Sequence, residues 1–423
     1  MRVIVAHPNA QHSHRLALAI QRAGWLEAYV TQLYYNRCRW PFSLVCLLPR
    51  QIQARIDDLL FRRHLEGLDP DRVTTSGLWA ELAFVLLNRL GMAKNLRERW
   101  LFYTSRRFSG RVGCLAAMNA DMVIGTDGAS LDAFRIAKQA GVTCVLDLSH
   151  PHVLTCLRIE QEERELAPEF SKTFDSFAMD SSDIDYHVAE VQEADAVIVA
   201  STFAKESLVE NDIDLKRVHV VPYGVDTKRF HPPEQAVASN GVSNDRLRVL
   251  FVGRAGQRKG IGYLLQAVHE LRKTHNVSLT VVGNLWGDAL AFEPYAEDYV
   301  HLGRVPDSIF PQVYHQADVF VLPSLIEGFG LVILEAMAAG LPVIVTQNTG
   351  GRDLVEDGVE GFIIPIRNVK VLQERLIYLS ENPNVRRQMG QAARRKAERY
   401  PWERYYQGIA ETVQEIHRGR MPL

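Results

Sequence analysis

Short apolar runs alternate with stretches of helical spacing in the first half of the chain. Residues 2–6 (RVIVA) read as a buried strand, and a helical stretch follows at about 14–23. Residues 50–110 are mostly helical in pattern and rich in arginine. The apolar run 142–150 closes a strand–helix–strand unit, and the run 196–201 predicts one more strand. The first half therefore carries the rhythm of a sheet whose strands are joined by helices.

The same rhythm restarts in the second half. Residues 248–253 (RVLFVG) predict a strand, and the helix that follows places four apolar side chains on one face: Leu264, Leu265, Val268 and Leu271. Further apolar runs, each ending at Gly, Pro, Ser or Thr, lie at 278–283, 317–324, 341–346 and 360–365. A long polar helical insert, residues 158–194, separates the strands of the first half from one another.

This alternation predicts an α/β fold of two Rossmann-like domains, each with its own parallel sheet. The stretch 231–246, which contains Pro, Gly, Ser and Asn and has no apolar period, reads as the linker between them. The expected domains are residues 1–230 and 247–398, and a final helix at about 400–418 is entered through Pro401.

Composition excludes several classes of protein. The formal net charge of -2 gives no global field that would attract nucleic acid. The apolar run Trp40–Pro49 is shorter than the roughly 20 residues that a spanning helix needs. The first residues do not resemble a signal peptide, which favours the cytoplasm. The 5 cysteines form no CxxC pair, which argues against a disulfide framework or a zinc site.

The strongest candidate for chemistry is the segment 324–340, SLIEGFGLVILEAMAAG. Gly328 and Gly330 allow close approach of the backbone to a ligand just where a helix begins, and such a helix N-terminus favours a phosphate. Glu335 stands among apolar residues and needs a partner, which the hydroxyls of a ribose would supply. Glu327 would face the other end of the same ligand. A salt bridge is the alternative for either glutamate alone.

A second candidate, residues 251–260 (FVGRAGQRKG), follows a strand but does not match G-x-G-x-x-G, so dinucleotide binding is poorly supported. Arg254 and Lys259 would instead place two cations at the carboxyl edge of the sheet, where they can stabilise a departing diphosphate. Two solvated loop charges are the alternative.

Together these stretches resemble the glycosyl transferases group 1 domain, that is, glycosyltransferase family 4 with the GT-B fold. The resemblance extends through 301–305 (HLGRV), 317–344, 348–351 (NTGG) and 357–362 (DGVEGF), and earlier through 193–208 and 221–232. It covers most of the chain from about residue 120 to 406, whereas the first 110 residues match poorly. It implies two domains facing each other across a cleft, with the C-terminal helix crossing back to the first domain.

The resemblance also implies roles for individual residues. Glu335 would bind the donor ribose as the second glutamate of an E-x7-E motif, and Glu327 would lie close to the transferred sugar. Arg254 and Lys259 would hold the diphosphate. The full set of expected donor-binding residues is Gly253, Arg254, Lys259, Arg304, Val305, Glu327, Gly328, Phe329, Gly330, Leu331 and Glu335.

The family typically uses no metal and no cofactor, and it transfers the sugar with retention by front-face attack. The chain does contain two D-x-D sequences, Asp183–Asp185 and Asp212–Asp214, which in another transferase fold would bind a metal. Both lie in stretches that read as helix or turn surface. They are therefore interpreted as solvated charges.

On the acceptor side, His150 ends the strand at 142–150, and similar family members carry a histidine there, near the transferred sugar. His150 is thus expected to be catalytic together with Glu327, Arg254 and Lys259, with His152 as the reserve. The family's glycine-rich acceptor loop corresponds here to residues 7–14 (HPNAQHSH), which has no glycine. Its three histidines, His7, His12 and His14, either line an acceptor pocket or are exposed loop residues.

Arginines interleave with aromatic and aliphatic residues in 36–63 and 97–111. This pattern suits peripheral contact with an anionic membrane or with a lipid-linked acceptor. Amphipathic helices whose arginine stems cover the core are the alternative.

The expected activity is therefore transfer of a sugar from a nucleotide sugar to a hydroxyl of a carbohydrate, lipid-linked or small-molecule acceptor. Two alternatives remain open at this point: an epimerase or another enzyme on the same fold, and a non-catalytic protein that binds nucleotide sugars.

Overall fold

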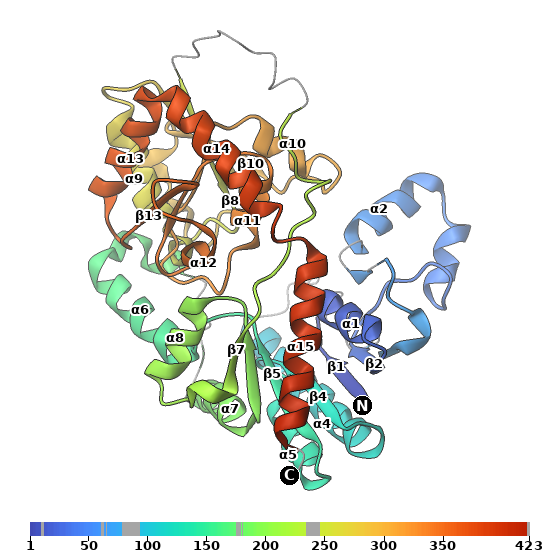
Figure 1. Ribbon diagram of the computed structural model, residues 1–423. Helices are drawn as coiled ribbons and strands as arrows, with labels where there is room; N and C mark the ends of the chain where they lie inside the picture. Colours follow the sequence, from blue (N-terminus) through green and yellow to red (C-terminus); the bar gives the residue numbers. More distant parts are fainter. Residues whose placement is uncertain are drawn as a thin grey trace.

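The computed structural model describes residues 1–9, 12–60, 63–64, 66–77, 94–174, 179, 181–233 and 246–420 (Figure 1). Among these residues, the first domain has a parallel sheet of seven strands in the order β3-β2-β1-β4-β5-β6-β7. The strands are β1 (Val3–Ala6), β2 (Leu26–Thr31), β3 (Val73–Thr75), β4 (Met122–Thr126), β5 (Thr143–Leu148), β6 (Ala196–Val199) and β7 (Val218–Val220).

Helices connect these strands and cover the sheet. Most of β1, β4, β5 and β6 is completely buried, as expected for strands with helices on both faces. The α-helices of this domain are α1 (Ser13–Arg22), α2 (Arg50–Leu60), α4 (Lys94–Asn119), α5 (Leu131–Gln139), α6 (Val153–Leu166), α7 (Ser181–Glu193) and α8 (Thr202–Glu210).

The second domain repeats this plan with a parallel six-stranded sheet in the order β10-β9-β8-β11-β12-β13. Its strands are β8 (Leu247–Val252), β9 (Val277–Val282), β10 (Tyr299–Gly303), β11 (Val319–Leu322), β12 (Val343–Thr346) and β13 (Gly361–Ile364). Its α-helices are α9 (Ile261–Leu271), α10 (Phe310–His315), α11 (Leu331–Ala338), α12 (Gly351–Leu354), α13 (Val369–Glu381) and α14 (Pro383–Ala397).

In both sheets the strand order reverses beside the first strand, between β1 and β4 and between β8 and β11. Loops at such a switch point diverge to opposite faces and leave a crevice at the carboxyl edge of the sheet, where open α/β sheets bind ligands. The predicted α/β fold of two Rossmann-like domains is therefore confirmed.

The last helix, α15 (Trp402–Arg420), packs against α1 of the first domain, as Figure 1 shows. Arg15 of α1 donates a hydrogen bond of 2.7 Å to the Tyr406 hydroxyl, and its guanidinium lies 4.7 Å from the centre of the Trp402 ring. The C-terminal helix thus crosses back to the first domain, as expected, and ties the two domains together.

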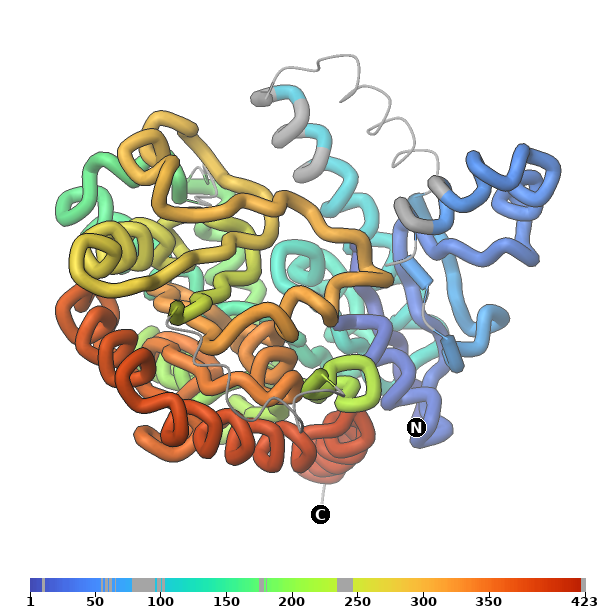
Figure 2. The backbone as a smooth tube through the Cα atoms, turned by 90° about the horizontal axis from the view of Figure 1, so that it is seen from above, coloured from blue at the N-terminus to red at the C-terminus, as the bar shows by residue number. Residues whose placement is uncertain are grey.

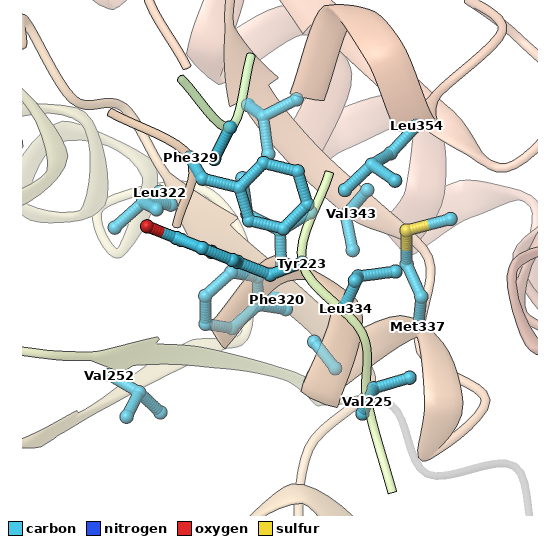
Figure 3. Close-up of a cluster of buried hydrophobic side chains, with 14 of the residues drawn as sticks. Tyr223, Val225, Val252, Phe320, Leu322, Phe329, Leu334, Met337, Val343 and Leu354 are labelled. Atoms are coloured by element: carbon cyan, nitrogen blue, oxygen red, sulfur yellow. The ribbon is translucent and has the colours of Figure 1, made fainter. Parts of the chain in front are cut away.

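Apolar packing is continuous from one domain to the other. Figure 3 shows Tyr223 and Val225, which follow β7, among side chains of the second domain. The Tyr223 ring lies 5.3 Å from the Phe329 ring in an edge-on arrangement, and both residues are buried. This contact sets the position of the loop between β11 and α11.

A buried carboxylate joins the domains on the other side of the structure. Glu163 of α6 is fully buried and accepts hydrogen bonds from three residues of the second domain. Its Oε1 lies 2.6 Å from both Gln257 Nε2 and the Tyr263 hydroxyl, and its Oε2 lies 2.7 Å from Arg367 Nε. A carboxylate buried this deeply is stable only because these donors replace water.

The structure corrects the sequence reading in two places. The insert 158–194 is not one helix, because the chain breaks at Pro168, which begins a short 3₁₀ turn between α6 and α7. The region 50–110, expected to be mostly helical, also contains the edge strand β3, which is too short and too exposed to show an apolar period. Most of the expected linker 231–246 lies outside the described residues.

Candidate active site

The loop between β11 and α11 carries Glu327, Gly328 and Gly330 at the switch point of the second sheet. Gly330 has φ 84°, a left-handed conformation that favours glycine, and it begins α11. A Cβ on Gly328 would lie 1.9 Å from the carbonyl oxygen of Ser149, so no larger residue fits there. The glycine loop therefore touches the carboxyl end of β5 in the first domain.

Lys259 and Glu327 form an ion pair within this crevice. Lys259 follows β8 and Glu327 follows β11, so neighbouring strands bring them together. Their side chains are only 12% and 15% exposed. Burial would raise the pKa of Glu327, but Lys259 and Arg258 outweigh burial and lower it, so this carboxylate stays ionised.

Arg258, rather than Arg254, lies beside this pair. Its guanidinium donates a hydrogen bond of 3.1 Å to the carbonyl oxygen of Ile326 and contributes to the low pKa of Glu327. Arg254 is exposed and lies 4.4 Å from the centre of the Trp286 ring. Sequence reasoning missed Arg258 because three basic residues share this loop and spacing alone does not tell which one faces the crevice.

Glu335 lies on α11, half-buried, and accepts a hydrogen bond of 2.7 Å from the Tyr314 hydroxyl. Tyr314 itself is fully buried, so it supports the carboxylate from the side of the core. This hydrogen bond gives Glu335 the partner that a carboxylate among apolar residues needs. The assignment of Glu335 to the donor ribose stays a prediction.

The other expected donor residues vary in exposure. Arg304 is exposed, whereas Val305 and Leu331 are half-buried and pack against the core. Gly253 has φ 143° and packs closely against the side chain of Lys259. The assignment of these four residues to donor binding stays a prediction.

In the first domain, next to Gly328, His150 forms an ion pair with Asp127, with 2.8 Å between Nε2 and Oδ2. Asp127 follows β4 and His150 follows β5, again on neighbouring strands. Burial alone would lower the pKa of His150, but the Asp127 carboxylate raises it overall. The sequence drew attention to His150 but not to Asp127, since nothing in the run TDG marks a histidine partner.

The histidines of residues 7–14 are not exposed loop residues, which corrects one of the two sequence interpretations. His7 and His14 are each 4% exposed, and burial lowers the pKa of both to about 4, so they are neutral at pH 7. The His12 side chain lies 2.7 Å from the buried carboxylate of Asp147. The reserve residue His152 is buried and caps the start of α6.

Other candidate features lie away from this crevice. Asp183 and Asp185 belong to α7, where Asp183 is half-buried and Asp185 is exposed, and Asp212 and Asp214 are exposed beside a turn. Across the described ranges, no cluster of three or more His, Cys, Asp or Glu side chains is arranged to hold a metal ion. None of the described helices combines the length and the apolar character that crossing a membrane requires.

Comparison with known proteins agrees with this geometry. Residues 234–396 match the model of the family described as Glycosyl transferases group 1. The matched segment is the second domain, and the match agrees there with the resemblance found in the sequence.

Curated proteins with similar sequences are named glycosyltransferases. One is a D-inositol 3-phosphate glycosyltransferase of Paenarthrobacter aurescens, 32% identical over 238 residues, which are 53% of this chain and 58% of that protein. Another is an uncharacterized glycosyltransferase of Methanocaldococcus jannaschii, 38% identical over 140 residues, which are 31% of this chain and 35% of that protein. The matches thus span little more than half of these relatives, or less.

Solved structures share the whole fold. HepE of Anabaena, determined in complex with UDP-glucose, matches with a TM-score of 0.63 at 17% identity, covering 98% of this chain and 100% of that one. Sucrose-phosphate synthase of Thermosynechococcus elongatus matches with a TM-score of 0.60 at 18% identity, covering 99% of each chain. The chain therefore has the GT-B fold.

Proposed function

We propose that this protein is a retaining glycosyltransferase that moves a sugar from a nucleoside diphosphate sugar to an acceptor hydroxyl without a metal ion. The observation that carries the proposal is the cluster of Lys259, Glu327 and the Gly328–Gly330 loop beside His150. The complexes of HepE with UDP-glucose and with UDP support a nucleotide sugar as the donor.

Each part of the donor has a suitable partner in this arrangement. Lys259 and Arg258 supply positive charge for the diphosphate, and the N-terminus of α11 adds backbone amides. Glu335 would accept hydrogen bonds from the ribose. When a diphosphate binds, Lys259 would share its charge between the phosphate and Glu327, whose carboxylate would then turn to the sugar hydroxyls.

The proposed reaction exchanges one bond at the anomeric carbon for another. The bond from this carbon to the diphosphate oxygen breaks, and the acceptor oxygen forms a new bond on the same face of the sugar. The departing phosphate oxygen takes the acceptor's proton, so the products are the glycosylated acceptor and the nucleoside diphosphate. Cations held in a water-poor crevice stabilise the charge that develops on that leaving group.

Two alternatives make different predictions. An epimerase would convert the nucleotide sugar in the absence of any acceptor, and a non-catalytic binding protein would leave both donor and acceptor unchanged. The buried Lys259–Glu327 pair favours an enzyme, because a site without function has no need to hold two charges in a crevice.

We also propose that the first domain touches an anionic membrane through one apolar surface. Figures 1 and 2 show the segment with α2 standing out from the rest of that domain. Large apolar side chains are exposed there, in the short 3₁₀ helix Phe42–Leu47 and beside it: Trp40 (68%), Leu44 (54%), Leu47 (81%), Leu48 (39%) and Ile52 (44%). Such a cluster is typical of an interaction surface.

The arginines of this region have mixed surroundings. Arg37 and Arg39 form ion pairs with Asp57 and Asp71, whereas Arg50 is exposed. The side chains of Arg55, Arg62, Arg97 and Arg99 lie outside the described part of the chain.

Flotation with anionic liposomes tests this apolar surface. Leu47→Glu should abolish binding of the protein to the liposomes, and Leu215→Glu, which changes another exposed leucine, should not. If the wild-type protein does not bind anionic liposomes at low salt, the proposed membrane contact is wrong.

The experiment for the main proposal is incubation of the purified protein with a panel of nucleotide sugars, with and without candidate acceptors, followed by chromatography that separates epimers and by mass spectrometry. Release of nucleoside diphosphate together with a glycosylated acceptor, or with free sugar when water is the acceptor, supports a transferase. Conversion of the donor to its epimer would replace this proposal with the first alternative.

A further inference from the structure

A cavity that is open to solvent lies beside His150 in the first domain. It is formed by the loops after β4 and β5 and by helices α6 and α7 of the first domain. His150 belongs to both places, because it lines the cavity and its backbone packs against Gly328. Whatever occupies the cavity therefore lies beside the position expected for the transferred sugar.

The wall of the cavity is mainly aliphatic. Val153, Cys156 and Leu157 of α6 line it and are only partly buried, which leaves apolar surface facing the open space. More than half of the lining residues are apolar, and no Phe, Tyr or Trp is among those that the structure describes there. Sugars are usually held by polar and aromatic side chains, so this wall fits an apolar group better than a sugar ring.

The polar side chains of the cavity are carboxylates and histidines. Asp127 pairs with His150, Glu160 pairs with Arg164, and Glu190 accepts hydrogen bonds from the amides of Gly128 and Ser130. Within the described lining there is no lysine or arginine. The Asp127 and Glu160 carboxylates are thus paired, and burial raises the pKa of Glu190 to about 8, so the described lining has no unpaired cation that would attract a phosphate or carboxylate ligand.

His187 of α7 provides a polar anchor for an uncharged group. It lines the cavity beside Gly128, and its side chain has no hydrogen bond to any described residue. Burial lowers its pKa against the opposing effect of Asp127, so the ring is neutral and offers one donor and one acceptor. A hydroxyl group satisfies both.

We propose that this cavity binds the acceptor, and that the acceptor is an uncharged hydroxyl compound with an apolar group next to the reacting hydroxyl. The proposal rests on the proposed glycosyltransferase function, and it adds the class of acceptor. The apolar group would lie against α6, and the hydroxyl would point past His187 toward His150 and the donor sugar.

Three glycosides separate the features that the cavity should recognise. 4-Nitrophenyl β-D-glucopyranoside is neutral and has an apolar group, its glucuronide counterpart adds a carboxylate, and methyl β-D-glucopyranoside lacks the large apolar group. Their dissociation constants for the wild-type protein can be measured by titration calorimetry. The neutral nitrophenyl glycoside should bind at least about tenfold more tightly than either of the others.

Filling the cavity should remove this preference. Leu157→Trp places a larger side chain in the open space and should weaken binding of the nitrophenyl glucoside at least about tenfold. Leu154→Trp is the matched control, since Leu154 lies on the same helix, is 41% exposed and does not line the cavity. Val153→Phe, which fills the same space from the start of α6, serves if Leu157→Trp unfolds.

The outcomes are distinct for the two proposals. Equal or tighter binding of the glucuronide, no binding of the nitrophenyl glucoside, or affinity unchanged in both filling variants would overturn the cavity proposal. Titration of the same proteins with nucleotide sugars reports on the donor site separately. If the wild-type protein binds no nucleotide sugar, the proposed function fails, whatever the glycosides do.

Discussion

At the scale of single residues, the candidate site is built on two ion pairs, Lys259–Glu327 in the second domain and Asp127–His150 in the first. Lys259 and Glu327 were expected near one ligand, and they meet because each follows one of two neighbouring strands. Tyr314 and Asp127 were not foreseen. A partner supplied by another strand or helix depends on packing, and a single sequence carries no local sign of it.

The Asp127–His150 pair predicts a charge effect that can be measured directly. Asp127→Asn removes the carboxylate that raises the pKa of His150, so this pKa should fall, to or below the ordinary value of 6.5. NMR titration of the His150 ring checks this shift. An unchanged midpoint in Asp127→Asn would mean that the carboxylate does not control the charge of His150.

The same pair makes stability depend on pH with a defined sign. Because the pKa of His150 is raised on folding, its contribution is fully present below the unfolded value of about 6.5 and is lost as the pH rises through the folded pKa. The difference in melting temperature between wild type and Asp127→Asn should therefore shrink from pH 6 toward alkaline pH. A difference that grows over this range would contradict the assignment.

Substitution of Glu335 tests its proposed role in donor binding, with Glu335→Gln as the control for Glu335→Ala. Glu335→Ala removes the acceptor for the ribose and leaves the buried Tyr314 hydroxyl without its partner, so donor affinity should fall about tenfold or more and stability by ~1–3 kcal/mol. Glu335→Gln keeps an oxygen in place and should retain most of the stability. Unchanged donor affinity in Glu335→Ala, measured by calorimetry, would contradict the assignment of Glu335 to the donor ribose.

At the scale of elements, the apolar periodicity predicted the buried strands well because both faces of a parallel sheet are covered. It failed for β3 at the edge, where the side chains are mostly exposed, and for the insert 158–194, where Pro168 breaks the helix. The Gly328–Gly330 turn was recognised from its glycines. That it fits against the first domain could not be foreseen, because the contact with Ser149 joins two domains.

The absence of a side chain at Gly328 allows the loop between β11 and α11 to lie against the end of β5. Gly328→Ala would place a methyl group 1.9 Å from the carbonyl oxygen of Ser149, so the glycine loop and the end of β5 must separate. We expect a lower melting temperature and weaker donor binding. Gly358→Ala is a poor control because Gly358 has a positive φ, whereas Gly110→Ala adds a methyl group in open space within α4 and should lower neither the melting temperature nor the donor affinity. An unaltered Gly328→Ala protein would mean that the loop is not held in this position.

At the scale of the whole molecule, the contacts that hold the domains together include α15 packed on α1, the Tyr223–Phe329 packing, and the buried Glu163 with its three donors. The return of the last helix was expected from the resemblance. Glu163 was not, since a glutamate in a polar helical stretch ordinarily reads as solvated charge. Only the approach of the second domain buries it.

Removal of the Glu163 carboxylate should therefore lower the free energy of unfolding substantially. Glu163→Ala leaves Arg367 and Gln257 without their acceptor at the interface and should cost ~3–5 kcal/mol of stability. Glu162→Ala is the matched control, because Glu162 pairs with the same arginine at the surface and should cost no more than ~1 kcal/mol. Denaturant unfolding of both variants checks the difference, and equal losses would argue against a structural role for the buried carboxylate.

The most direct test of the central claim is calorimetric titration of a panel of nucleoside diphosphate sugars into wild-type protein and Lys259→Ala. At least one nucleotide sugar should bind the wild type, and Lys259→Ala should weaken that binding at least about tenfold while affecting the corresponding nucleoside much less. Binding of the nucleotide sugar that is equally tight without the Lys259 ammonium, or no binding to the wild type at all, would contradict a diphosphate site in this crevice.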